Sequence, residues 1–193
     1  SRKLRRGEHA GNRFKIILRE LRNHSDLEAG LKSIRLSGFP NYFGRQRFGI
    51  KGAKLERGML YFKGKIKASR SQRSFYLSAA RSYLFNLNLA ENILNGTWQS
   101  DHIGGPMYGD PQQDVVPLTP SEAEIFQSHE VLVAGLHKNR LRLERRPYCV
   151  VPEKLVWRFE DGIMVMEFDL PSGVFATSLL DELVEVTVAQ GEV

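Results

Sequence analysis

The sequence predicts an α/β (α+β) fold, because strand patterns stand near both ends of the chain and helical patterns stand between them. Residues 14–21 alternate apolar and polar side chains as a half-buried strand does. Residues 155–159 and 163–170 form a hairpin across Glu160-Asp161-Gly162. Apolar residues make up 41% of the 193, which is enough for the core of one or two domains.

The first helix is expected over residues 25–36. Ser25 or Asp26 caps its start, and the spacing of its leucines and Ile34 places apolar side chains on one face. Gly38 follows the last apolar position, where a glycine commonly ends a helix. This helix therefore connects the first strand to the glycine-rich loop that follows.

Two long helices are predicted in the middle of the chain and a shorter one near its end. Residues 71–94 carry an apolar side that includes Phe75, and Thr119-Pro120 starts a helix that runs to about Ala134. Residues 98–117 read as loop, and residues 141–148 as a strand with a basic face. A helix over residues 175–184 follows a tight turn.

Charge is unevenly distributed along the chain. Residues 1–81 contain 21 Lys and Arg against 5 Asp and Glu, whereas the remainder contains 7 against 17, for a net charge of +6. A positive surface in the first half suits a polyanion, and nucleic acid is the leading candidate. Membrane binding is disfavoured, since the basic segment 63–73 lacks a broad apolar face.

Several function classes find no support in the sequence. No apolar run approaches the roughly 20 residues that span a bilayer, and no signal-peptide core follows Ser1. The single Cys149 excludes an internal disulfide and a cysteine-based zinc site, so we expect a reducing, cytoplasmic location. No phosphate-binding glycine loop is present, and Ser178 lies in no nucleophile elbow. The five histidines lack metal-ligand spacing: His9, His24, His102, His129 and His137.

The segment Gly38-Phe39-Pro40-Asn41-Tyr42-Phe43-Gly44-Arg45-Gln46-Arg47-Phe48-Gly49 combines aromatic rings and guanidinium groups between glycines. Aromatic faces and arginine planes both stack on nucleobases, so one interpretation is an RNA-contacting loop. The other is a solvated turn with its aromatics packed inward. Both interpretations remain open on composition alone.

Asn12, Phe14 and Phe175 form a second group of candidates. Asn12 can read a base edge with a donor and an acceptor, and Phe14 lies two residues further on. A strand-entry turn with Phe14 in the core explains the same pattern equally well. Phe175 follows Gly173 at a corner where a ring could enter a cleft, although a core position is the safer interpretation of that residue alone.

The chain resembles the bacterial tRNA pseudouridine synthase D family. The resemblance is carried, in family order, by residues 2–7 with 11–14, by residues 38–49, by Leu77-Ser78-Ala79-Ala80-Arg81-Ser82 and by Gly173-Val174-Phe175-Ala176-Thr177-Ser178. It implies a pseudouridine synthase core with a mixed, mainly antiparallel sheet and packed helices. Residues 1–38 and 152–193 would form parts of this catalytic core, and residues 39–151 a family-specific insertion domain.

The resemblance also implies a reaction. Family members isomerise a uridine of tRNA, at position thirteen, by breaking the glycosidic bond and rejoining the ribose to carbon five of the base. An aspartate is the nucleophile, and neither a metal nor an organic cofactor is required. The family's Gly-Gln-Lys-Asp-Lys-His segment would precede Ser1, so we expect this chain to be the C-terminal part of a synthase, to hold no catalytic residue and to be inactive alone.

By position in the family motifs, Asn12 and Phe175 would bind the uridine and Phe14 would pack beside them. The expected partner is tRNA, bound by a monomer. The candidate phosphate contacts are Arg5, Arg45, Arg47, Lys51, Arg73 and Arg81. Two alternatives are a noncatalytic RNA-binding module and a protein-interaction domain whose aromatics belong to the core.

The chain departs from the family pattern at two places. The stretch that follows Trp98 is shorter than in relatives, so the insertion domain is expected to be incomplete there. Asp181 stands where relatives often have an arginine, a cation that would help keep an active-site carboxylate ionised. We expect that role to be unfilled here or to be taken by another residue.

Overall fold

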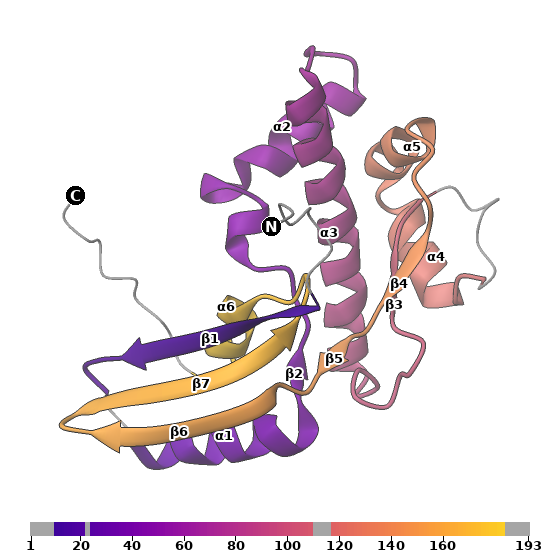
Figure 1. The fold of residues 1–193 in the computed structure, drawn as a ribbon. Coiled ribbons are helices and arrows are strands. Elements are labelled where there is room, and N and C mark those ends of the chain that lie inside the picture. Colours follow the sequence, from indigo (N-terminus) through magenta and orange to yellow (C-terminus); the bar gives the residue numbers. More distant parts are fainter. Residues whose placement is uncertain (1–9, 22–23, 110–116, 184–193) are drawn as a thin grey trace. The chain divides into compact units, whose positions relative to one another are not determined.

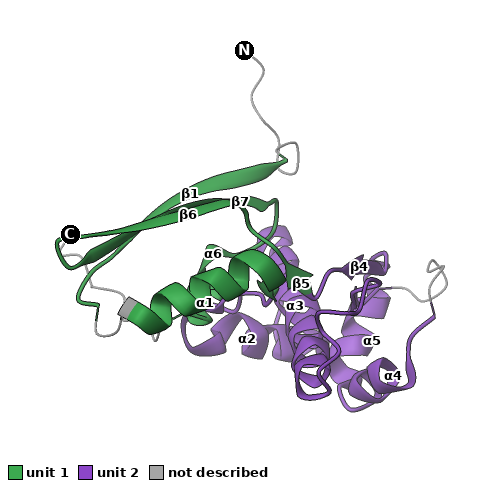
Figure 2. Cartoon of the chain, turned by 90° about the horizontal axis from the view of Figure 1, so that it is seen from below, with its two compact units in different colours: residues 1–41, 149–193 green, residues 42–148 purple. Residues whose placement is uncertain are grey.

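The computed structural model describes residues 10–21, 24–109 and 117–183. The chain divides into two compact units (Figure 2). Unit 1 combines residues 1–41 with residues 149–193, and unit 2 is the continuous stretch 42–148. The family-specific insertion domain expected over residues 39–151 stays a prediction.

Unit 1 is built on a three-stranded antiparallel sheet (Figure 1). Strand β7 (Ile163–Pro171) lies in the centre, between β1 (Gly11–Leu18) and β6 (Glu153–Glu160). The predicted hairpin is confirmed, with Asp161 and Gly162 at its turn in left-handed conformations. The first strand was placed three residues too late, since its ladder begins at Gly11 and the backbone turns at Glu20, whose φ is 55°.

One face of this sheet forms the core of unit 1. Val165 of β7 is buried on one face, and alternate residues from Met164 to Leu170 are buried on the other, as the two-residue period of a strand requires. They pack against Leu31 of α1 (His24–Ser37) and Leu179 of α6 (Ala176–Asp181). Figure 2 shows both helices on the same side of the sheet. The predicted helix over residues 25–36 is thus confirmed.

The end of α1 depends on a glycine. Gly38 has φ +79°, and its N–H donates to the carbonyl of Ile34 at 2.9 Å, which closes the helix. A Cβ at this position would stand 2.5 Å from Cys149 Sγ, so a side chain would be excluded by space as well as by conformation. Immediately afterwards, β2 (Phe39–Pro40) pairs with β5 (Cys149–Val150).

Unit 2 is organised around the 25-residue helix α3 (Arg70–Leu94). Its predicted extent is confirmed, and Ser69 and Gln72 form a reciprocal capping box at its start. Helices α2 (Ala53–Phe62), α4 (Pro120–Gln127) and α5 (Glu130–Lys138) pack around it. The core unites residues of α3, α4 and α5 with Tyr108, which follows Met107: Leu77, Ala80, Leu84, Tyr108, Phe126, Leu132 and Leu136.

Some sequence-based predictions for unit 2 were wrong. The single helix expected over residues 119–134 is divided at His129, whose φ and ψ of −123° and 40° are not helical. The expected loop 98–117 contains β3 (Gly105–Met107), which pairs with β4 (Glu144–Arg146), a shorter strand than expected. The helix α2 was not predicted.

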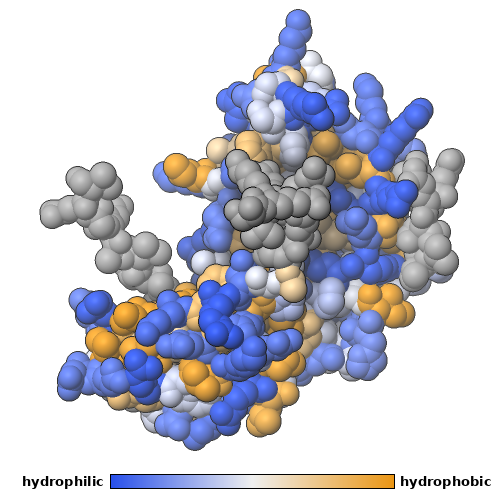
Figure 3. Space-filling model, viewed as in Figure 1, coloured by the Kyte–Doolittle hydropathy of each residue, from blue (hydrophilic) through white to orange (hydrophobic). Residues whose placement is uncertain are grey.

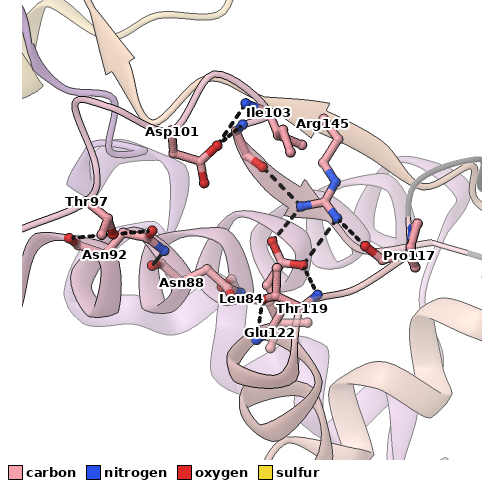
Figure 4. A network of polar contacts seen from close by, with 11 residues as sticks. Leu84, Asn88, Asn92, Thr97, Asp101, Ile103, Pro117, Thr119, Glu122 and Arg145 are labelled. Carbon is pink, nitrogen blue, oxygen red and sulfur yellow. Dashed lines mark hydrogen bonds and ion pairs between the residues drawn. The ribbon is translucent and has the colours of Figure 1, made fainter. Parts of the chain in front are cut away.

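A buried ion pair connects these elements of unit 2 (Figure 4). The Arg145 guanidinium donates to the Glu122 carboxylate, and also to the carbonyls of Gly104 at 3.0 Å and Pro117 at 3.1 Å. The same carboxylate accepts from the N–H of Thr119 at 2.9 Å as part of the α4 capping box. The Arg145 and Glu122 side chains are only 14% and 6% exposed, so this buried pair ties β4 to the start of α4.

Glu122→Ala should destabilise unit 2 by about 3–5 kcal/mol, because it leaves the Arg145 charge buried without its partner. Urea denaturation followed by circular dichroism measures this loss. The double variant Glu122→Leu with Arg145→Met should be more stable than Glu122→Ala, since no charge is then buried. Equal stability of these two variants would contradict the role assigned to the pair.

Candidate functional site

The start of β1 and the turn after β7 lie together, although they come from opposite ends of the sequence. Asn12 is opposite Leu170 in the ladder, and the N–H of Ser172 donates to the carbonyl of Ala10 at 3.2 Å. A Cβ at Gly11 would stand 2.5 Å from the Leu170 carbonyl oxygen, so only glycine allows this close approach. The turn leads through Gly173 to Phe175.

Phe14 lies on the core face of β1, two residues after Asn12. Its ring stacks on that of Phe168, directly opposite in the ladder, with centroids 5.4 Å apart and planes inclined at 24°. It is partly buried against the core of unit 1, whereas the Asn12 side chain at the end of the strand is exposed. Phe14 thus belongs to the core, and its packing supports the strand end that presents Asn12.

Phe175 is the residue that precedes α6. Its backbone is extended, with φ −103° and ψ 120°, and its carbonyl accepts from the Ser178 N–H at 3.1 Å in the first turn of the helix. The side chain is half-buried. Gly173, with φ +85°, allows the sharp turn that places this aromatic residue after β7.

Asn12 lines a hollow of about 510 Å³ in unit 1, together with residues of β1, β6 and β7. Asp169 also lines it, and accepts from Arg13 at 2.7 and 2.9 Å and from Lys154 at 3.0 Å. These hydrogen bonds, with the nearby positive charges, hold the pKa of the Asp169 carboxyl far below its usual range. Asp169 is therefore an ionised structural anchor that joins all three strands.

The cations predicted to contact phosphates differ in their exposure and in their hydrogen bonds. Arg45, Lys51 and Arg73 are exposed. Arg47 is half-buried and donates to Ser78 Oγ at 2.8 Å, and burial lowers its pKa. Arg81 donates to the carbonyls of Met107 and Arg142 at 2.9 and 2.8 Å and pairs with Glu144, so its guanidinium serves the packing of unit 2.

Arg5 lies outside the described residues. Asp181, the last residue of α6, is exposed.

A cluster of cations around Phe43 was missed by sequence reasoning. The Arg146 guanidinium carbon lies 4.1 Å from the centroid of the Phe43 ring, and that of Arg47 lies 5.3 Å from the same centroid. Burial, and then the charge of Arg47, lower the Arg146 pKa to about 10. Asn86 fixes the Phe43 backbone by hydrogen bonds of 2.9 and 3.1 Å. The basic pattern of residues 141–148 was visible in the sequence, but its pairing with Phe43 was not.

The described residues show neither a metal-binding cluster nor a membrane-spanning helix. No group of three or more His, Cys, Asp or Glu side chains there is arranged to hold a metal ion. In the same ranges, none of the helices has both the length and the apolar character that crossing a membrane requires.

The fold is shared with a pseudouridine synthase. A solved structure from Methanosarcina mazei, assigned as a tRNA pseudouridine synthase D, matches with a TM-score of 0.61 over 93% of this chain and 70% of that chain, at 16% sequence identity. The α/β fold class with antiparallel sheets and packed helices is thereby confirmed.

Sequence comparisons find the same family. The model of tRNA pseudouridine synthase D matches residues 1–69. The tRNA pseudouridine synthases D of Histophilus somni and Marinobacter nauticus are 33% and 36% identical to this chain, each over 96% of its length. The chain is thus similar to tRNA pseudouridine synthases D over nearly its whole length. It spans 65% and 59% of the length of these two relatives.

The ionised Asp169 carboxylate should make the stability of the fold depend on pH under acidic conditions. An unfolded aspartate has a pKa of about 3.9. Because the folded-state pKa is lower, protons bind the unfolded chain first, and stability is lost as the pH falls below about 4. Asp169→Asn should make the dependence of the urea midpoint on pH shallower in this range. Asp161→Asn, in the exposed β6–β7 turn, is the matched control and should keep the wild-type slope.

Proposed function

We propose that this chain is the uridine-binding and RNA-binding part of a tRNA pseudouridine synthase that acts in the cytoplasm on the uridine at position thirteen. The observation that carries the proposal is the meeting of two family segments in unit 1. The turn before Phe175 lies against the strand end that carries Asn12, and Asn12 falls within the residues that the family model matches. The similarity to relatives over 96% of the chain supports the same conclusion.

The reaction requires a base to be held while its bond to ribose is exchanged. The bond between C1′ and N1 breaks, a bond between C1′ and C5 forms, and the hydrogen of C5 is replaced by one on N1, so the product is an isomer. The uridine must leave the RNA stack to be attacked. Phe175 offers a ring for the extruded base, and Asn12 offers a donor and an acceptor for its edge.

We place the nucleophilic aspartate in a segment that this chain does not contain. The family motif Gly-Gln-Lys-Asp-Lys-His is absent from the 193 residues, and the relatives are longer than this chain. Asp169 lines the hollow with Asn12, but it is engaged by Arg13 and Lys154. The role of Asp169 is therefore structural.

The exposed cations of unit 2 would supply affinity for the phosphates of tRNA. Arg45, Lys51 and Arg73 lie free of the packing contacts that hold Arg81. If about six cations of the chain engage phosphates, the logarithm of the binding constant should fall with that of salt with a slope of about −4 on single strands. Duplex regions would give a steeper slope.

A second candidate function is a noncatalytic RNA-binding module. This function is favoured for the chain taken alone, because Asp169 in the hollow is held by Arg13 and Lys154. The other acid that lines the hollow is Glu153, on the edge strand β6. The two functions share tRNA binding and differ in isomerisation.

Tritium release from tRNA labelled at C5 of uridine separates them. The chain alone should bind tRNA and release no tritium, and the chain joined to a segment that carries the Gly-Gln-Lys-Asp-Lys-His motif should release it. If the joined protein folds and binds tRNA without release, the noncatalytic module is the correct function. Release by the chain alone would contradict our placement of the nucleophile, and a lack of tRNA binding would contradict both functions.

Phe175→Ala and Asn12→Ala should each weaken catalysis by the joined protein. Loss of one base stack costs about 1–3 kcal/mol, or roughly 5- to 150-fold in kcat/KM. Phe175→Tyr retains a ring and should lose little, whereas Phe175→Leu should resemble Phe175→Ala. Full activity of the leucine variant would show that Phe175 contributes packing and does not stack on the base.

A further inference from the structure

We propose that Phe75 and Lys54 of unit 2 form a binding position for one unpaired nucleotide of the RNA, with the base on the Phe75 ring and the phosphate at the Lys54 ammonium. This inference rests on the proposed function, since it concerns the same RNA. It adds a contact in unit 2 to the uridine site assigned to unit 1.

The Phe75 ring is presented to solvent, although the sequence pattern placed it on the apolar side of α3. Its exposed fraction is 51%, whereas its neighbours Tyr76 and Leu77 are 4% and 9% exposed. The residue lies in the second turn of a 25-residue helix with a reciprocal capping box, so its backbone is well supported. An aromatic ring displayed on a rigid helix is suited to stack on a flat partner.

Lys54 places a cation beside this ring. Its Nζ lies 5.5 Å from the Phe75 ring centroid and 3.3 Å from the Gln46 carbonyl oxygen, to which it donates. The ammonium has three donors, and the carbonyl engages one of them. A nucleotide has the matching chemistry, a planar base joined to an anionic phosphate, in the same close arrangement as the ring and the ammonium.

The charge of the surrounding segment favours RNA over a protein partner. Between residues 45 and 73 there are ten cations and a single acid, Glu56. Hydrophilic side chains predominate at the top of Figure 3, where Figure 1 shows the end of α2 and the start of α3 in the same view. The cations are Arg45, Arg47, Lys51, Lys54, Arg57, Lys63, Lys65, Lys67, Arg70 and Arg73. An apolar protein surface docked here would cover these charges without neutralising them, whereas a phosphate backbone neutralises them.

The position selects unpaired nucleotides, because the bases of a duplex already stack on one another and turn their faces away from solvent. Loops and ends of RNA offer free base faces. Lys51 adds a further cation for the RNA phosphates, because its side chain is exposed. It lies in the turn that precedes α2, between Gly49 and Gly52, where its φ is 50°.

Fluorescence titration of a single-stranded oligonucleotide that contains 2-aminopurine tests the inference with the whole 193-residue chain. Phe75→Ala and Phe75→Leu should each weaken binding roughly 5- to 150-fold and reduce the quenching of the probe, and Phe75→Trp should retain both. Lys54→Gln should reduce the magnitude of the salt slope by about 0.7. Leu94→Ala, at the far end of α3 and 82% exposed, is the matched control and should bind as the wild type does.

The outcomes separate this inference from the proposed function. If the wild type does not bind RNA, the proposed function itself fails. If the wild type binds and Phe75→Ala or Phe75→Leu binds equally well with unchanged circular dichroism, the stacking position is wrong and the proposed function stands. Loss of self-association in Phe75→Ala, with RNA affinity unchanged, would show that the ring is a protein contact instead.

Discussion

The β1–β7 ladder is the contact on which unit 1 depends. It pairs eight residues of β1 with eight of β7, from Gly11 opposite Pro171 to Leu18 opposite Met164, and so joins two segments separated by the whole of unit 2. The buried face of β7 supplies the core that α1 and α6 cover. The end of the same ladder sets the Asn12 strand end against the turn that leads to Phe175. The same strand pairing therefore forms both the sheet and the candidate site.

The two units use charge differently. In unit 1, the exposed face of the sheet matches its charges across strands, as in the pairs Arg13 with Asp169 and Lys15 with Glu167. These pairs leave little net charge on that face, and the more exposed pair, Lys15 with Glu167, contributes little to stability. In unit 2, the basic segment of residues 45–73 contains too few acids to match its cations. That excess is available to a polyanion, which is why the proposed RNA contacts concentrate there.

Periodicity and turn residues predicted the elements that rely on local chemistry. The hairpin at Asp161-Gly162, the end of α1 at Gly38 and the extent of α3 were all visible in the sequence. Long-range contacts could not be predicted from the sequence. Phe75 is exposed although its spacing places it on the apolar face of α3. The Arg81 guanidinium donates to the carbonyl groups of distant residues. The family motifs indicated Asn12 and Phe175, but only the register of β1 and β7 explains why these segments meet.

The pairing of β2 with β5 has a consequence for the order of folding. Phe39 lies opposite Val150 and Pro40 opposite Cys149, so the chain leaves unit 1 and returns to it at adjacent positions. Closing a flexible loop of about 100 residues has an entropic cost that grows with the logarithm of its length. If unit 2 folds first as a continuous stretch, its packed core shortens the loop that unit 1 must close. Slow non-local pairing of β1 with β7 would then follow rapid helix assembly, and the sheet would be the last part of the protein to form.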